Sequence, residues 1–386
     1  MAGGAGGNQL GMESSQPLTH ESTQAPDLVK VVRRPGPFLS LYLNTEGDVE
    51  NAARRSATRW RGVRADLEAK GVPGPVLDQI GELVPHAHLE GQCLAVIADA
   101  ERLLHAEHGP SVSSVDEASW EPVPHLLPIV RWRQSQPPYV VTLTDRTGAD
   151  LYAFRRGAPE LHGEVEGEHD VIRKVQAGGW SQRRYQQRAE DSWAGNAEQV
   201  AERVAKLVDR VDAKLLVVAG DVRAVQLLQE SLPDRVQALV HVVHGERPRE
   251  APGEAIPDEV DDVVSAYVKG ETDEILARFE EERGQRDKAV EGFEETASAL
   301  MRAQVALLLS PAGRGDRSLW FGADLTTLAS TDRELKELGV DSPHQAEAHD
   351  VLVGASLVTG AGIRVLEDVQ DRRSPREGVG ALLRWT

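Results

Sequence analysis

The chain has 386 residues, of which 40% are hydrophobic and 27% are charged, and its formal net charge is −19. A chain of this length and composition is expected to fold into two or three globular domains with buried cores. The strong negative charge argues against a uniformly basic nucleic-acid-binding protein. Net charge averages over the whole surface, however, so local basic segments can still bind phosphate groups.

The sequence carries no membrane or targeting signal. No run of about 18 apolar residues is present, so we expect no membrane-spanning helix and no membrane partner. Residues 1–26 are rich in Gly, Ser and Gln and lack the basic-then-apolar order of a signal peptide, so we expect a disordered leader. Cys93 is the single cysteine, which excludes an intrachain disulfide. These features predict a cytoplasmic protein.

The first predicted domain spans residues 27–135 and is of the α/β type. Strands are expected at 36–44 and 91–100, with a helix at 51–71 between them. On this helix, one face is apolar and contains Ala53, Ala57, Trp60, Val63 and Leu67. Five arginines lie mostly on the other face: Arg54, Arg55, Arg59, Arg61 and Arg64. Guanidinium groups bind phosphate through paired hydrogen bonds, so these are candidate RNA-binding residues, with a solvated helix face as the alternative.

Prolines between 122 and 138 predict a boundary near residue 135 and a second domain over residues 136–258. A hairpin is expected at 138–154 around a D-R-T-G turn, followed by a weaker strand near 160–168. A helix at 196–212, with Asn196 as its N-cap, precedes a strand at 213–221, a helix at 222–232 and a strand at 237–245. This order favours an RNase H-like mixed sheet with helices packed on it.

The third predicted domain spans residues 259–386 and is a small α/β unit. An acidic helix is expected at 261–302, then strands at 305–310 and 318–324 and a helix near 346–358. Two further strands are expected at 363–368 and 379–385.

A second basic segment, residues 171–189, contains no acidic residue. Gly178 and Gly179 permit backbone conformations that other residues avoid, and they allow close approach to a ligand. Trp180 and Tyr185 offer ring faces on which bases could stack. Arg183, Arg184, Arg188 and Gln182 add charge and hydrogen-bonding groups. This composition is typical of an RNA-contacting loop, and an ordinary exposed loop is the alternative.

The segment G-G-W-S-Q-R-R-Y resembles the loop-to-helix segment of archaeal and eukaryotic class-one release factors, in which Gly-Gly-Gln is followed by Ser and later by Arg and an aromatic residue. Gly178, Gly179, Ser181, Arg184 and Tyr185 match that pattern. The closing strand, Gly378–Trp385, is similar to the last strand of the third domain in the same superfamily. The chain therefore resembles the bacterial branch of the release factor and Pelota superfamily, and most closely the Balon-type ribosome hibernation factors of actinobacteria.

This resemblance implies a three-domain architecture with an RNase H-like middle domain and a ribosomal-protein-like C-terminal α/β domain. It also implies binding to rRNA in the A site of the 70S ribosome. The N-terminal domain would lie near the decoding centre, the glycine loop near the peptidyl-transferase centre, and the third domain near a translational GTPase such as EF-Tu.

Trp180 departs from the family pattern, because release factors carry glutamine at this position for peptidyl-tRNA hydrolysis. An indole has one donor and no acceptor, so it cannot replace an amide. The sequence thus favours a hibernation factor that occupies the A site without releasing the peptide. A peptidyl-tRNA hydrolase or ribosome-rescue factor is the first alternative.

The second alternative is a nuclease. Asp145 and Asp221 end predicted strands, and Glu198 or Glu202 lies on the helix predicted at 196–212. RNase H-like nucleases hold two Mg²⁺ ions with carboxylates at comparable places. Turn aspartates and a solvated glutamate explain the same residues, and the histidines lack the spacing of a zinc site. We therefore expect no metal and no cofactor.

Overall fold

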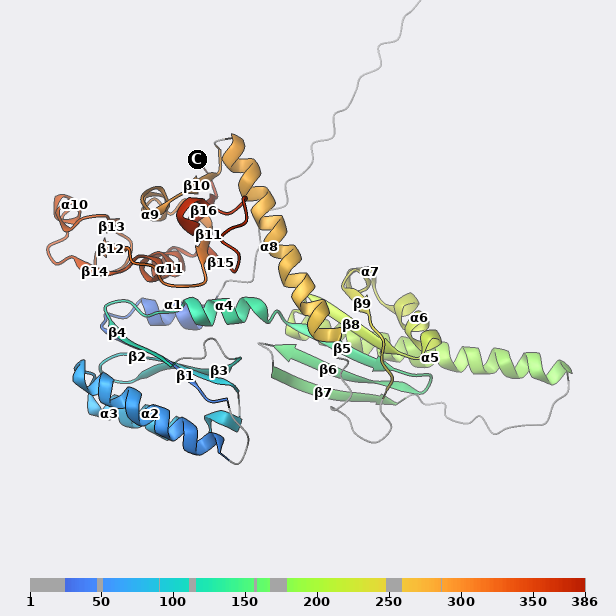
Figure 1. Ribbon diagram of the computed structural model, residues 1–386. Helices are drawn as coiled ribbons and strands as arrows, with labels where there is room; N and C mark the ends of the chain where they lie inside the picture. The colour runs from blue at the N-terminus through green and yellow to red at the C-terminus, as the bar shows by residue number, and fades with distance from the viewer. Residues whose placement is uncertain are drawn as a thin grey trace, which may run out of the picture.

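The computed structural model describes residues 25–46, 51–89, 91–110, 116–155, 158–166, 179–247, 259–285 and 287–385. In these residues, helices pack on four sheets (Figure 1). The mixed α/β class predicted from the sequence is confirmed. The predicted leader lies outside the described residues up to position 24, and α1 (Pro26–Val32) follows it. No helix in the described part of the chain is long and apolar enough to cross a membrane.

The N-terminal sheet is antiparallel and is buried on both faces. Its order is β3-β2-β1-β4, with β1 (Phe38–Asn44), β2 (Cys93–Ala98), β3 (Leu103–Gly109) and β4 (Glu117–Glu121). Successive side chains of a strand point to opposite faces. One face of β1 therefore packs against α2 (Ala52–Ala69) and α3 (Gly74–Leu83) through Leu39, Leu41 and Leu43. The other face carries Phe38 and Tyr42. A 3₁₀ turn (Ala87–Leu89) follows α3.

The middle sheet has five strands in the order β7-β6-β5-β8-β9. β5 (Tyr139–Thr144), β6 (Gly148–Arg155) and β7 (Ala158–Glu166) are antiparallel, whereas β8 (Leu215–Gly220) and β9 (Val240–Val242) run parallel to β5. α5 (Gly179–Val211) and α6 (Val222–Ser231) cover one face, and α7 (Asp234–Gln237) leads into β9. The β-β-β-α-β-α-β order predicted from the sequence is confirmed.

The C-terminal part contains a four-stranded sheet and a smaller three-stranded one. The first has the order β10-β16-β11-β15, with β10 (Ala289–Glu291), β11 (Val305–Pro311), β15 (Gly362–Leu366) and β16 (Gly380–Leu383), which a 3₁₀ turn (Arg376–Gly378) precedes. The second has the order β13-β12-β14, with β12 (Ser318–Phe321), β13 (Leu328–Ala329) and β14 (His344–Glu347). The helices are α9 (Phe293–Met301), α10 (Asp332–Glu337) and the largely buried α11 (Ala348–Thr359).

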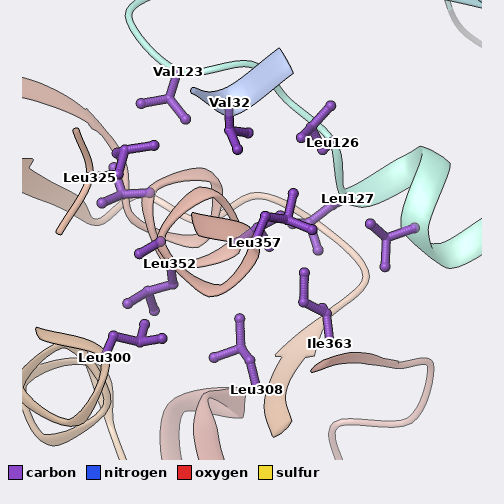
Figure 2. Packing of buried hydrophobic residues seen from close by; sticks show 14 of the residues in the cluster. Val32, Val123, Leu126, Leu127, Leu300, Leu308, Leu325, Leu352, Leu357 and Ile363 are labelled. Atoms are coloured by element: carbon purple, nitrogen blue, oxygen red, sulfur yellow. The ribbon is translucent and has the colours of Figure 1, made fainter. Parts of the chain in front are cut away.

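The N-terminal and C-terminal parts share one hydrophobic core, although more than 100 residues of sequence separate them. In Figure 2, residues of the N-terminal part pack against α11 together with residues of α9, of the loop after β12 and of the C-terminal sheet. The labelled residues are Val32, Val123, Leu126, Leu127, Leu300, Leu308, Leu325, Leu352, Leu357 and Ile363. Helix α4 (Leu127–Ser135) also covers the edge strand β15. The Gln134 side chain donates to Val365 O and accepts from Val365 N, both at 2.8 Å, so it pairs the open edge as a further strand would.

A buried polar network crosses the same seam. Asp350 of α11 is fully buried, and His125 Nδ1 lies 2.6 Å from its Oδ1. Arg314 donates to Asp350 Oδ2 from Nε at 3.0 Å and from Nη2 at 2.6 Å, and it also binds Glu121. The network therefore ties β4 and the chain after it to α11.

Helix α8 (Glu259–Gln285) packs on both the middle and the C-terminal sheets. Val260 and Val264 belong to the core of the middle sheet, whereas Ile275, Leu276 and Phe279 belong to the core of the C-terminal sheet. The middle sheet is thus covered by helices on both faces, as its apolar strands require.

Two predicted helices have different limits in the structure. The acidic helix predicted at 261–302 ends at Gln285, because β10 pairs with β16 and interrupts it before α9 begins. The helix predicted at 196–212 begins at Gly179 instead, so Asn196 lies inside α5 and is not an N-cap. Its side chain donates from Nδ2 to Arg146 O at 3.1 Å.

Candidate functional site

The predicted glycine segment leads directly into α5. Gly178 lies outside the described residues, whereas the other predicted site residues fall within the first ten positions of α5: Gly179, Trp180, Ser181, Gln182, Arg183, Arg184, Tyr185 and Arg188. The backbone at the position that corresponds to the release-factor glutamine is therefore helical.

The two ends of α5 have different surroundings. Buried residues recur at helical spacing from Asn196 onwards, including Ala197, Val200, Val204 and Val208. The N-terminal part of α5 extends past the edge of the sheet (Figure 1). A rise of 1.5 Å per residue gives about 25 Å from Gly179 to Asn196. We call residues 179–192 the α5 arm.

A tight turn between β5 and β6 lies at the base of this arm. Asp145 Oδ1 accepts from Thr147 N at 2.7 Å, from Thr147 Oγ1 at 2.6 Å and from Gly148 N at 2.9 Å. Glycine is required at 148, because a Cβ there would lie 1.9 Å from Val165 O. These bonds fix the conformation of the turn and hence the position of Arg146 at its tip.

Arg146 connects the turn to both α5 and α6. Its guanidinium carbon lies 4.6 Å from the centroid of the Trp193 ring, which is a cation–π contact. Its Nε and Nη2 atoms lie 3.3 and 3.2 Å from the carboxylate of Asp221. The Asp221 carboxylate in turn accepts from the amides of Arg223 and Ala224 and so caps α6.

The environments of Asp145 and Asp221 favour their charged forms. Burial acts to raise the pKa of each carboxyl. For Asp221, the hydrogen bonds from Arg146 and the α6 amides outweigh burial and hold its pKa below the usual value. For Asp145, the Thr147 bonds and the charge of Arg247 have the same effect on its pKa. Arg247 also binds the buried Asp150 at 3.2 Å.

The carboxylates considered for a nuclease site are engaged in other roles. Asp145 and Asp221 follow the neighbouring parallel strands β5 and β8, but they bind turn and cap amides and arginines. Glu202 pairs with Lys206 on the exposed face of α5, and Glu198 is exposed. Among the described residues, no group of three His, Cys, Asp or Glu side chains is placed to hold a metal ion.

The five arginines of α2 divide into two sets. Arg59 pairs with Asp116 at 3.3 Å, and Arg64 pairs with Glu68 and Asp78, both at 2.8 Å. The other three are exposed and have no ion pair with any described residue: Arg54, Arg55 and Arg61.

The buried face of α2 differs in part from the prediction. Trp60 and Leu67 are buried as predicted, but Ala52 and Ser56 are buried in place of Ala53 and Ala57, which are exposed. The candidate phosphate-binding residues of α2 therefore comprise two arginines in ion pairs and three without an ion pair to any described residue.

Reasoning from the sequence missed three residues of the α5 base: Arg146, Trp193 and Arg247. The D-R-T-G turn was identified as a hairpin signal, but nothing in the local sequence links it to a tryptophan 47 positions later. The packing of α5 against the hairpin brings Arg146 and Trp193 together, and the chain after β9 brings Arg247 to the turn, where it binds Asp145 and Asp150.

Comparison with known proteins places the chain in a family. Residues 138–285 match the model of bacterial archaeo-eukaryotic release factor family 2. The chain is 30% identical to the protein Rv2629 of Mycobacterium tuberculosis over 367 aligned residues. This alignment covers 92% of this chain and 95% of Rv2629. The protein MT2704 from another strain of the same organism matches equally. The chain belongs to the same family as Rv2629 and carries a domain of bacterial archaeo-eukaryotic release factor family 2 over residues 138–285.

Several solved structures also align with the chain, at low sequence identity. Saccharomyces cerevisiae Dom34, a translation termination-like factor, has a TM-score of 0.38 and 10% identity, over 64% of this chain and 63% of that chain. The match thus spans less than two thirds of Dom34. The archaeal translation termination factor aRF1 has a TM-score of 0.26 and 15% identity, over 93% of this chain and 97% of aRF1. Archaeal Pelota, in a model of ribosome-bound Pelota and ABCE1, has a TM-score of 0.42 and 16% identity, over 76% of this chain and 72% of that Pelota chain.

Proposed function

We propose that this protein occupies the A site of the 70S ribosome without releasing the nascent peptide, and so acts as a hibernation or protection factor. The observation that carries the proposal is Trp180, which stands in a release-factor-like Gly-Gly segment where the hydrolytic glutamine is expected. The family assignment supports a translation-factor role, and the tryptophan argues against termination chemistry.

The helical backbone of the α5 arm strengthens this argument. Helix α5 starts at Gly179, so consecutive positions are rotated by about 100° around its axis. Gln182 is two positions after Trp180 and therefore lies about 200° around the helix. It cannot take the place of the missing glutamine unless this turn of helix unwinds.

The charge distribution fits a ribosomal target. The α5 arm contributes Arg183, Arg184 and Arg188, and α2 contributes three unpaired arginines in a different part of the molecule. Arginine is well suited to the phosphates of rRNA. In this proposal the domain of residues 27–135 lies towards the decoding centre, and the α5 arm lies towards the peptidyl-transferase centre. The domain of residues 259–386 faces a translational GTPase such as EF-Tu.

Two assays test the proposal. In the first, the protein is sedimented with 70S ribosomes, and wild type is compared with a variant in which Arg183, Arg184 and Arg188 are all alanine. The matched control replaces Arg203 and Arg210, two exposed arginines in the packed part of the same helix. We expect the wild type and the control to co-sediment and the triple variant to be released. Absent binding, or equal loss in the control, would refute ribosome binding through the α5 arm.

The second assay measures peptide release from ribosomes that carry peptidyl-tRNA in the P site. We expect no release above background from the wild-type protein, even at concentrations that saturate the ribosomes. Release by the wild-type protein would favour the peptidyl-tRNA hydrolase or rescue factor instead. The Trp180→Gln variant restores the amide and shows whether the remainder of the segment supports hydrolysis.

A further inference from the structure

Two described side chains of α5 contact the β5–β6 turn near the base of the α5 arm. Among the α5 side chains that the structure describes, Trp193 and Asn196 make the contacts closest to Gly179. Both contacts are with Arg146: its guanidinium lies over the Trp193 ring, and its carbonyl oxygen accepts from Asn196 Nδ2. One residue of the β5–β6 turn therefore holds the helix where its buried stripe ends.

Arg146 is itself held in place from the opposite side. Asp221 binds its guanidinium while capping α6, and α6 packs on the sheet. The turn that carries Arg146 is closed by Asp145. The connection from β8 through Asp221 and Arg146 to Trp193 is thus continuous and consists of short polar and cation–π contacts.

A small change at this anchor has a large effect at the tip of the arm. The fourteen residue-to-residue steps from Gly179 to Trp193 span about 21 Å of helix. A tilt of roughly 10° at Trp193 therefore moves Gly179 by about 4 Å, given that rise per residue. A displacement of this size exceeds the range of a hydrogen bond, so contacts at the tip depend on the anchor.

We propose that Arg146 is a positioning residue that sets the direction of the α5 arm relative to the middle sheet. Its importance for ribosome binding rests on the proposed function, because the arm carries the residues assigned to rRNA there. The position of the arm itself can be measured without the ribosome.

The test is a distance measurement in the full-length protein. Cysteines are introduced at Gln187 in the arm and at Glu230 on α6, and both are spin-labelled; the native Cys93 is buried in β2 and is protected from labelling. Pulsed electron resonance then gives the distribution of distances between the labels. The variants are Arg146→Ala, Arg146→Lys and the matched control Arg223→Ala. Among the described residues, the Arg223 side chain of α6 binds Gln226 and makes no ion pair.

We expect a single narrow distribution in the wild type and in the Arg223→Ala control. Arg146→Ala should broaden the distribution or shift its mean by about 4 Å, the displacement that the helical rise predicts. Arg146→Lys keeps the charge but loses the planar group, so it should restore part of the wild-type distribution. A lower melting temperature with an unchanged distribution would show that Arg146 only stabilises the fold, and it would overturn the proposal.

Sedimentation of the same variants with 70S ribosomes separates this inference from the proposed function. If Arg146→Ala changes the distances and weakens ribosome binding several-fold, both are supported. If the distances change but no variant, including wild type, binds ribosomes, the positioning role stands and the proposed function fails. If the distances do not change, the positioning role fails whatever the ribosome assay shows.

Discussion

Replacement of Asp350 by asparagine tests how the N-terminal and C-terminal parts are joined. Asp350 is fully buried, and its two carboxylate oxygens lie within bonding distance of His125 and Arg314. Asparagine has nearly the same shape but keeps only one acceptor oxygen. In Asp350→Asn an NH₂ group therefore faces either the His125 ring or the Arg314 guanidinium, and the negative charge is lost.

The expected cost follows from these contacts. Burial acts to lower the pKa of Arg314, but its attraction to Asp350 and Glu121 outweighs burial and raises that pKa. Arginine stays protonated in proteins, so the guanidinium remains charged in the variant and loses one of its two charged partners. Hydrogen bonds to charged groups contribute about 1.5–3 kcal/mol each, and removal of one partner of a buried ion pair costs about 3–5 kcal/mol. We expect the free energy of unfolding to fall by about 3 kcal/mol.

Urea denaturation followed by circular dichroism measures this change. The control is Asp332→Asn, which removes an exposed carboxylate paired with Lys336 and should leave the midpoint unchanged. Because the network lies in a core common to both parts, Asp350→Asn should shift the unfolding of the N-terminal and C-terminal parts together. A loss below about 1 kcal/mol, well under the cost of a broken buried pair, would refute the assigned role of the network. So would a shift confined to one part.

Three further predictions concern the core, a tyrosine and the basic surface. Leu352→Ala leaves a cavity in the shared core and should lower the free energy of unfolding by about 2–5 kcal/mol in urea. Burial, aided by a nearby carboxylate, raises the pKa of Tyr139 to about 12. The stability that the neutral Tyr139 side chain contributes is therefore complete below the ordinary tyrosine pKa of about 10 and is lost as the pH rises through about 12. Tyr139→Phe should reduce the loss of stability in that pH range. Alanine at Arg54, Arg55 and Arg61 together should lower the slope of log affinity for ribosomes against log salt by about 2–3, as expected for three phosphate contacts, and an unchanged slope would exclude α2 from the interface.

Local sequence patterns were sufficient to predict the strands and helices that form the middle sheet. The alternating runs around the D-R-T-G turn, the apolar run of β8 and the stripe of α5 each report one element through its own periodicity. Elements whose identity depends on a distant partner were missed or misplaced. The three-residue strand β10 exists only because it pairs with β16, and its absence from the prediction merged α8 and α9 into one helix.

The shared core was not predicted for the same reason: it depends on a partner that is distant in the sequence. Phe38, Tyr42 and Ile97 are apolar residues on the second face of the N-terminal sheet, so the sequence does signal that this face is covered. It does not signal that the cover is α11, because that helix lies about 250 residues further along the chain. The unpaired state of three α2 arginines likewise depends on where Asp116 and Asp78 lie in space, which helical spacing alone does not report.

Under the proposed function, the distribution of charge gives the acidic residues a role in selectivity. Two of the five α2 arginines are paired with carboxylates, and the arginines of the α5 arm lie within residues 171–189, which contain no acidic residue. A net charge of −19 repels nucleic acid from most of the surface, so weak binding to arbitrary RNA is suppressed. Stable binding then requires a target that meets both basic surfaces at once, because each one alone adds only a few phosphate contacts. A folded RNA surface such as the ribosome meets this condition, whereas a short RNA duplex that reaches only α2 or only the α5 arm should bind weakly.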